Sequence, residues 1–160
     1  MTTNPDMYER FKLLQTYRRI AIVGLSADPY RPSHFVAIYM QAAGYEIIPI
    51  NPRYAGKEIL GQRVFRSLTE AQAAGKEIEI VDVFRKAEET PALAEEAIRI
   101  GARVLWLQLG VENDETGRIA HEAGLTFVQN RCVKIEHARF FGGLNTIGLN
   151  TGIILAKKLK

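Results

Sequence analysis

A chain of 160 residues is long enough for one domain with a real core and too short for two domains of ordinary size. With 47% hydrophobic and 24% charged residues it is typical of a globular protein, and no apolar run approaches the roughly 20 residues of a membrane span. A net charge of +3 permits an anionic small ligand but is not the dense basic stripe of a nucleic-acid binder, so we expect neither a membrane nor a nucleic acid as partner.

The N-terminus has neither the basic start nor the apolar segment of a secretory signal. The single cysteine, Cys132, excludes an intramolecular disulfide and suits a reducing compartment. Three separated histidines and one cysteine make no cluster of metal ligands. These features predict a cytoplasmic protein without a bound metal.

Hydrophobic periodicity and turn residues predict alternating helices and strands. The expected helices cover residues 7–15, 33–43, 68–74, 90–100, 113–123 and 133–140. The expected strands cover 18–23, 45–51, 78–84, 103–108 and 125–129, with an irregular segment at 54–64. Pro49 interrupts the second strand and favours a place near the edge of the sheet, because proline cannot donate a ladder hydrogen bond.

The helix ends carry recognisable signals. Ser67 and either Asn113 or Asp114 are expected N-caps, and Thr90 is expected to cap a helix that has Pro91 at its first position. At the other end, a glycine follows four helices just before the next strand, as expected for residues that adopt a left-handed conformation cheaply: Gly44, Gly75, Gly101 and Gly124.

Short connections between alternating helices and apolar strands imply an α/β fold. We expect one doubly wound domain over residues 1–140, with about five mostly parallel strands and helices on both faces. Residues 141–160 are expected to form a C-terminal arm that packs on the domain or on a partner subunit.

A ligand in such a fold lies beyond the carboxyl ends of the strands. The glycine- and serine-rich loop after the first strand offers backbone amides, a helix N-terminus and the hydroxyls of Ser26 and Ser33. Three strand ends or loops add a guanidinium group each, at Arg31, Arg53 and Arg85. A ligand with several phosphates is therefore expected. The alternative for Arg31 and Arg53 is an ordinary surface arginine, and Arg85 could be held by Asp82 or Glu88.

Two features argue against NAD. The first loop has Gly24 without a second glycine two residues later, and the second strand ends in Asn51, Pro52 and Arg53, where an acidic residue would bind the ribose hydroxyls of NAD. An arginine there favours a phosphate on the ribose, which both NADP and CoA carry.

Six motifs in one order make the chain resemble the CoA-binding domain family, small proteins similar to the N-terminal domain of the succinyl-CoA synthetase α subunit. They are Gly24-Leu25-Ser26, Arg31-Pro32-Ser33-His34, Ile48-Pro49-Ile50-Asn51-Pro52, Val81-Asp82-Val83-Phe84-Arg85, Leu105-Trp106-Leu107-Gln108-Leu109-Gly110-Val111 and Asn130-Arg131-Cys132-Val133-Lys134-Ile135-Glu136-His137. The resemblance implies a Rossmann-like fold and a CoA site. The expected site residues are Gly24, Leu25, Ser26, Arg31, Pro32, Ser33, Asn51, Pro52, Arg53, Phe84, Arg85, Gln108, Leu109 and Gly110.

No catalytic residue follows from the resemblance, because the synthetase's phosphorylated histidine lies in a second domain without a counterpart here. His34 and His137 are expected to make structural hydrogen bonds. Cys132 is expected to be a small buried hydrophobe, with a thiol close to the CoA sulfur as the alternative.

Three functions remain open. The favoured one is a non-catalytic module that binds CoA or an acyl-CoA, alone, as a homodimer or with a partner enzyme. An NADP-type oxidoreductase and a regulatory or structural subunit with a vestigial nucleotide cleft are the alternatives.

Overall fold

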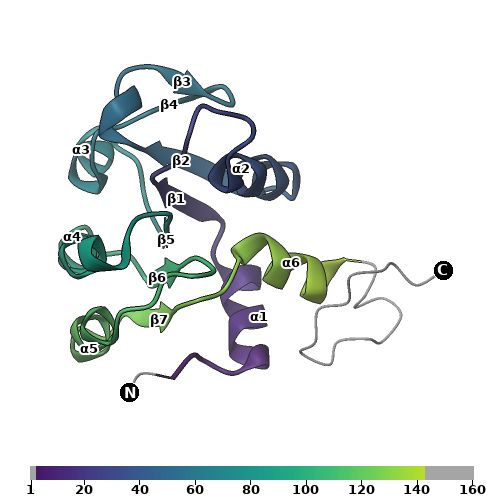
Figure 1. Cartoon of the computed structure of the whole chain (residues 1–160), viewed down its shortest axis with the longest axis vertical. Coiled ribbons are helices and arrows are strands. Elements are labelled where there is room, and N and C mark those ends of the chain that lie inside the picture. The colour runs from purple at the N-terminus through teal and green to yellow at the C-terminus, as the bar shows by residue number, and fades with distance from the viewer. Residues whose placement is uncertain (1–2, 143–160) are drawn as a thin grey trace.

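A parallel sheet of five strands lies between two layers of helices in the computed structural model, which describes residues 3–142 (Figure 1). The strands are β1 (Arg19–Val23), β2 (Glu46–Ile50), β5 (Ile80–Val83), β6 (Val104–Leu107) and β7 (Thr126–Val128). Their order is β2-β1-β5-β6-β7, and every neighbouring pair is parallel. The predicted Rossmann-like α/β architecture is confirmed.

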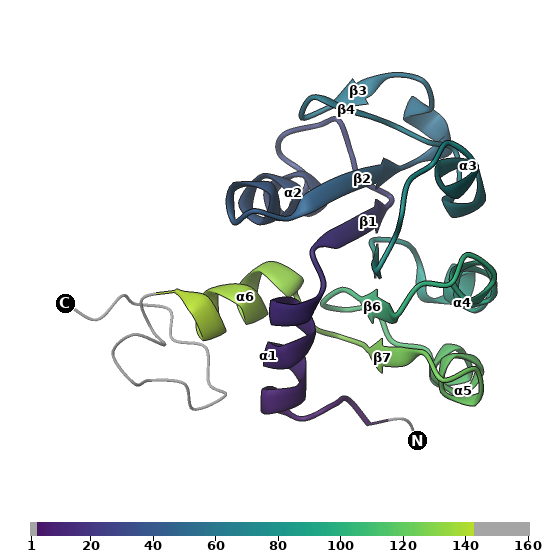
Figure 2. The ribbon, with the colours of Figure 1, turned by 180° about the vertical axis from the view of Figure 1, so that it is seen from behind.

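Helices cover both faces of the sheet, as Figures 1 and 2 show from opposite sides. One layer contains α3 (Leu68–Ala73), α4 (Thr90–Arg99) and α5 (Asp114–Glu122), and the other contains α1 (Met7–Thr16), α2 (Pro32–Ala42) and α6 (Val133–Phe141). Side chains of a strand alternate between the two faces, so Val81 packs in the first layer and Ile80 in the second. Asp82 therefore points to the same side as Ile80.

The edge position predicted for the strand with Pro49 is confirmed, since β2 ends the sheet. Beyond it, the amide of Phe65 donates to the carbonyl of Pro49 at 3.0 Å and the amide of Asn51 donates to that of Phe65 at 2.9 Å. The segment 54–64, expected to be irregular, begins at the end of a 3₁₀ turn, η1 (Pro52–Tyr54), and contains a small hairpin of β3 (Glu58–Ile59) and β4 (Gln62–Arg63).

The four helix-ending glycines all have positive φ, between +76° and +97°, as predicted. Ser67 caps α3 by accepting from the amide of Glu70 at 3.0 Å, and Asn113 caps α5 by accepting from the amide of Thr116 at 3.1 Å.

The expectation that Thr90 is an N-cap is wrong. A 3₁₀ turn, η2 (Ala87–Glu89), leads directly into α4, so Thr90 is already helical and Glu89 precedes the helix. The buried hydroxyl of Thr90 donates to the carbonyl of Ala87 at 2.6 Å and lies 2.7 Å from the hydroxyl of Thr116 on α5. The side chain joins two helices instead of capping one.

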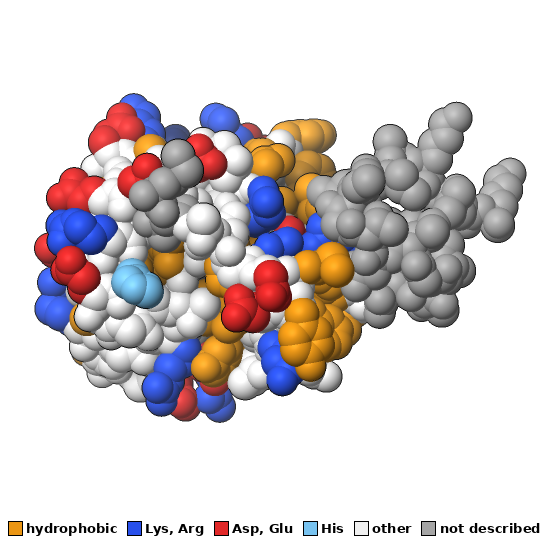
Figure 3. All heavy atoms as spheres, turned by 90° about the horizontal axis from the view of Figure 1, so that it is seen from below, with side chains coloured by type: hydrophobic (Ala, Val, Ile, Leu, Met, Phe, Trp, Pro, Cys, Tyr) orange, Lys and Arg blue, Asp and Glu red, His pale blue; other side chains and the backbone are white. Residues whose placement is uncertain are grey.

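The expected C-terminal arm lies almost wholly outside the described residues, which end one residue after α6. Among residues 3–142, no helix combines the length and the apolar character needed to cross a bilayer. Figure 3 shows acidic and basic side chains interspersed on the α5 side of the molecule, with apolar ones gathered toward α1. There Phe11 stacks on Tyr8 and on Phe141, with ring centroids 6.3 and 5.1 Å apart.

Candidate functional site

The sheet has a topological switch point between β1 and β5. The chain passes from β1 to β2 on one side and later returns to β5 on the other side. In open parallel sheets such a point leaves a crevice beyond the carboxyl ends of the two strands, where ligands bind. Gly24 follows β1 and Phe84 follows β5, so the candidate site lies above these two residues.

Gly24 lets the first loop lie directly against the end of β5. Its φ is +89°, and a Cβ at this position would overlap the carbonyl oxygen of Phe84. Only glycine combines this backbone conformation with so close an approach. The amide of Gly24 donates to the carbonyl of Ile50 at 2.8 Å, which also ties the loop to the end of β2.

Hydroxyl and imidazole groups hold the rest of this loop. Ser33 Oγ accepts from the amide of Ser26 at 3.0 Å, and Ser26 Oγ accepts from the amide of Asp28 at 3.0 Å. His34 Nδ1 lies 2.8 Å from the carbonyl oxygen of Ser26 and therefore carries the proton that it donates. The structural hydrogen bond expected of His34 is thus present, and Ser26 stabilises the turn that it belongs to.

A polar cavity of about 530 Å³ opens beside this loop. It extends from the N-terminus of α2 to the end of β2 and the end of β5. The residues that line it are Gly24, Ser26, Arg31, Pro32, Ser33, Asn51, Pro52, Arg53, Tyr54, Phe84 and Arg85. No side chain of the described residues caps α2. Pro32 has no amide hydrogen, and the amides of His34 and Phe35 donate to the carbonyl of Arg31, so the amide of Ser33 is the one that remains for an anion.

The three predicted arginines all line this cavity. Arg31 is largely exposed and lies 3.9 Å from Asp28, while the guanidinium of Arg53 lies 5.6 Å from the ring centroid of Tyr54. Within residues 3–142 no acidic side chain forms an ion pair with Arg53 or Arg85. Arg53 and Arg85 therefore bring positive charge to the cavity that no ion pair with a carboxylate of residues 3–142 neutralises.

Asn51 positions Arg53 and the first loop together. Its Nδ2 donates to the carbonyl of Leu25 at 3.0 Å, and its Oδ1 accepts from the amide of Arg53 at 3.0 Å. The Leu25 side chain is fully buried in the core below and does not line the cavity. Of this pair of predicted site residues, Asn51 lies at the wall and Leu25 supports it.

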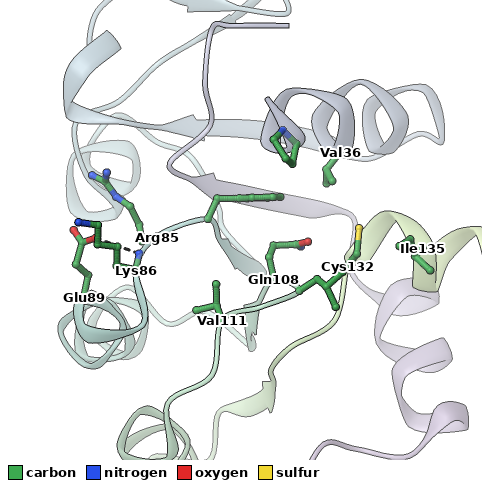
Figure 4. Close-up of a pocket in the computed structure, with 11 residues that line it drawn as sticks. Val36, Arg85, Lys86, Glu89, Gln108, Val111, Cys132 and Ile135 are labelled. Carbon is green, nitrogen blue, oxygen red and sulfur yellow. Dashed lines mark hydrogen bonds between the residues drawn. The ribbon is translucent and has the colours of Figure 1, made fainter. Parts of the chain in front are cut away.

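An apolar cavity of about 630 Å³ adjoins the polar one and shares Pro32, Phe84 and Arg85 with it. Its other lining residues are Val36, Lys86, Glu89, Gln108, Leu109, Val111, Cys132 and Ile135. In Figure 4, Arg85, Lys86 and Glu89 lie at one end and Cys132 and Ile135 at the other, with Gln108 between them. The two cavities form one groove with a cationic end and an apolar length.

A buried polar pair lies at the floor of the apolar cavity. Gln108 is only 3% exposed, and its Nε2 donates to Oδ1 of Asp82, which is completely buried. Burial raises the pKa of Asp82 to about 8, against a smaller lowering by the hydrogen bond from Gln108. The carboxyl group is therefore largely neutral at pH 7, and it pairs with Gln108 and not with Arg85.

Cys132 and Gly110 lie differently from expectation. Cys132 is half-buried at the wall of the apolar cavity, and burial is the main factor that raises the pKa of its thiol. Gly110 is exposed and lines neither cavity; its amide donates to Asn130 Oδ1 at 2.7 Å. Leu109 beside it does line the apolar cavity.

The structure thus brings all the predicted site residues except Leu25 and Gly110 to the walls of one groove. Prediction from the sequence missed the apolar contributions of Val36 and Ile135, which come from α2 and α6. Their helical spacing had no feature to separate them from core residues. The position of Val111 directly after a predicted strand end was a usable signal.

This chain is similar in sequence and fold to known proteins. A family model described as a CoA binding domain matches residues 18–138. An uncharacterized protein, YneT, of Bacillus subtilis (strain 168) is 44% identical over 135 residues, covering 84% of this chain and 96% of that protein. A hypothetical protein from Pyrococcus horikoshii OT3 has a solved structure that is 36% identical, with a TM-score of 0.81, covering 89% of this chain and 99% of that one.

A further solved structure, of cell-free ID.343 from Thermus thermophilus, is 33% identical with a TM-score of 0.80, and covers 86% of this chain and 100% of that chain. The residues matched by the family model, 18–138, include every residue that lines the two cavities of the groove. On this evidence the chain belongs to the CoA-binding domain family.

Proposed function

We propose that this protein binds CoA or an acyl-CoA in the groove formed by the two cavities and is itself a non-catalytic binding module. The observation that carries the proposal is the continuity of a cationic cavity and an apolar cavity through Pro32, Phe84 and Arg85. CoA has the same division, with a phosphorylated adenosine diphosphate at one end and a long pantetheine arm at the other.

The polar cavity suits the phosphates. The amide of Ser33 in the first turn of α2 can donate to the diphosphate, and three guanidinium groups surround the same space. Arg53 lies at the end of β2, where a nucleotide in this fold places its ribose. An arginine at this position favours the 3′-phosphate of CoA over a bare ribose.

The apolar cavity suits the pantetheine arm. Its walls are mostly aliphatic and aromatic, which favours the methylene and dimethyl groups of the arm. The oxygen Oε1 of Gln108 is buried and has no hydrogen-bond partner within the described part of the chain. An amide N–H of the arm would satisfy this acceptor, because an unpaired buried polar atom costs free energy.

Binding without catalysis is supported by how the candidate nucleophiles are held. A serine or cysteine nucleophile needs a base within hydrogen-bond reach. Ser26 and Ser33 accept from loop amides, and the Nδ1 atom of His34 is committed to a carbonyl oxygen. Burial raises the pKa of Cys132, which disfavours the reactive thiolate.

Calorimetric titration with CoA, 3′-dephospho-CoA, NADP and ADP tests the proposal. We expect CoA to bind most tightly, 3′-dephospho-CoA to bind more weakly because Arg53 loses its partner, and ADP to bind weakest because it lacks the arm. A preference for NADP accompanied by hydride transfer would replace the proposal with an oxidoreductase. Absence of binding by all four compounds would indicate a vestigial cleft.

A further inference from the structure

A third cavity, of about 250 Å³, continues the groove beyond the apolar cavity. The two share Leu109, Cys132 and Ile135. Cys132 and Ile135 lie at the end of the apolar cavity opposite Arg85 (Figure 4). The remaining walls of the third cavity are Arg10, Asn130, Arg131, Glu136 and Arg139. The order along the groove is therefore cationic, apolar and again cationic.

Three guanidinium groups of this third cavity share one carboxylate. Glu136 is 2% exposed, and its oxygens lie 2.7 Å from Arg139 Nη2, 3.5 Å from Arg10 Nε and 3.6 Å from Arg131 Nε. The three arginines come from α1, the loop after β7 and α6, so only the tertiary fold assembles them. Glu136 supplies one negative charge beside the guanidinium groups of Arg10 and Arg131, and one charge does not balance both in a partly desolvated site.

Arg10 shows the imbalance directly. Its side chain is 9% exposed, and Nη1 donates to the carbonyl of Pro5. Its Nε is buried and has no hydrogen-bond partner among the described residues, although Glu136 is near enough for an ion pair. Arg131 is the accessible member, with 41% of its side chain exposed. The cavity thus offers guanidinium donors for a second anion.

The place of this cavity relative to the proposed CoA site defines what the anion would belong to. With phosphates in the polar cavity and the pantetheine arm in the apolar one, the sulfur end of the arm reaches Cys132 and Ile135. An acyl group on that sulfur would continue into the third cavity. We infer that the acyl-CoA bound by this protein carries a carboxylate at the far end of its acyl group, recognised by Arg131 together with Arg10. This inference rests on the proposed CoA binding.

The test compares two thioesters of nearly equal shape. Succinyl-CoA carries the terminal carboxylate, and 4-methylpentanoyl-CoA replaces it with an isopropyl group of similar size. Binding of each, and of CoA itself, is measured by calorimetry at moderate salt. We expect succinyl-CoA to bind at least tenfold more tightly than 4-methylpentanoyl-CoA, as one charge-assisted hydrogen bond would produce.

A pair of variants locates the effect. Arg131→Gln should reduce the preference for succinyl-CoA about tenfold while leaving the affinity for CoA unchanged. Glu136 keeps Arg10 and Arg139 as partners in this variant, so the fold should be retained. Arg118→Gln, on the exposed surface of α5 beside Glu122, is the matched control and should keep the full preference.

The outcomes separate the two proposals. Equal affinity of the wild-type protein for the two thioesters, with CoA bound, overturns the carboxylate site and leaves the proposed function intact. A preference that survives Arg131→Gln also overturns the assignment to this cavity. If neither the thioesters nor CoA bind, both proposals fail together.

Discussion

The side-chain amide of Gln108 donates a hydrogen bond to the carboxyl group of Asp82, which is inaccessible to solvent. These two residues lie on adjacent parallel strands, at the end of β6 and within β5. Asp82 Oδ2 and Gln108 Oε1 have no further hydrogen-bond partner among the described residues. The floor of the apolar cavity is therefore a neutral polar pair at pH 7 and not an ion pair.

Asp82→Asn should change the pH dependence of stability. The pKa of Asp82 is about 8 in the folded protein and ordinarily 3.8, so between these pH values the folded state keeps a proton that the unfolded state releases. Stability of the wild-type protein should therefore fall as pH rises through this window, by at most about 1.4 kcal/mol per pH unit from this group. Asp82→Asn removes the titrating carboxyl group, so the stability of the variant should not show this decrease.

Urea denaturation of both proteins between pH 5 and pH 9 measures the difference. The stability of Asp82→Asn relative to wild type should increase with pH and level off above about 8. Asp114→Asn, at an exposed position of α5, corrects for the removal of one carboxylate. A difference that stays constant over the whole range would mean that Asp82 is already ionised when folded.

Gly24→Ala should destabilise the protein and abolish binding of CoA. The new methyl group would meet the carbonyl of Phe84, which belongs to the backbone and cannot rotate away. Gly124→Ala is a matched control, since it also has positive φ but open space around the missing Cβ. The control should cost about 1–2 kcal/mol for the left-handed backbone, and Gly24→Ala a further 1–3 kcal/mol, roughly, for the overlap. Equal stabilities of the two variants would contradict this account.

Arg53→Ala should weaken CoA binding by roughly 1.5–3 kcal/mol, the range for a hydrogen bond to a charged group. The same variant should have little effect on 3′-dephospho-CoA, because the phosphate that we assign to Arg53 is missing. Arg118→Ala serves as the control for the loss of a surface arginine. Calorimetry that finds an unchanged affinity for CoA would remove Arg53 from the site.

Alkylation should test the surroundings of Cys132. Burial raises the pKa of this thiol, so at pH 7.5 iodoacetamide should react with it more slowly than with a cysteine in a short peptide. Since Cys132 lines the apolar cavity, saturating CoA should slow the reaction further. Mass spectrometry follows the modified fraction with time. Protection by ADP equal to that by CoA would place the pantetheine arm elsewhere.

Local signals account for the accuracy of the predicted elements. Glycine at Gly44 or Gly101 ends a helix because of its own conformational freedom, and Ser67 caps a helix through its own hydroxyl. Thr90 shows the limit of this reasoning. Its pairing with Thr116 and the turn η2 depend on where α5 lies, which the residues around Thr90 do not encode.

The site residues likewise divide into those that local sequence predicts and those that depend on the tertiary fold. Residues next to strand ends, such as Arg53 and Phe84, were predictable because the carboxyl ends of parallel strands meet at one edge. The motif Gly24-Leu25-Ser26 predicts Leu25 as a site residue, yet the loop after β1 places its side chain in the core cluster that contains Ile20 and Ile22. Ile135 reaches the apolar cavity from α6, which is distant in sequence from the other walls.

By itself, the sequence determined the order and type of the elements, the parallel sheet and the collection of arginine and hydroxyl side chains at its carboxyl edge. These follow from interactions between residues near one another in the chain and from the periodicity of apolar side chains. Only the tertiary structure decided that Asp82 is buried against Gln108, that the groove continues past Cys132, and that Arg10, Arg131 and Arg139 surround Glu136. The burial of a side chain and the charge around it depend on which distant segments of the chain pack together. The pattern of a single sequence does not give the distances between such segments.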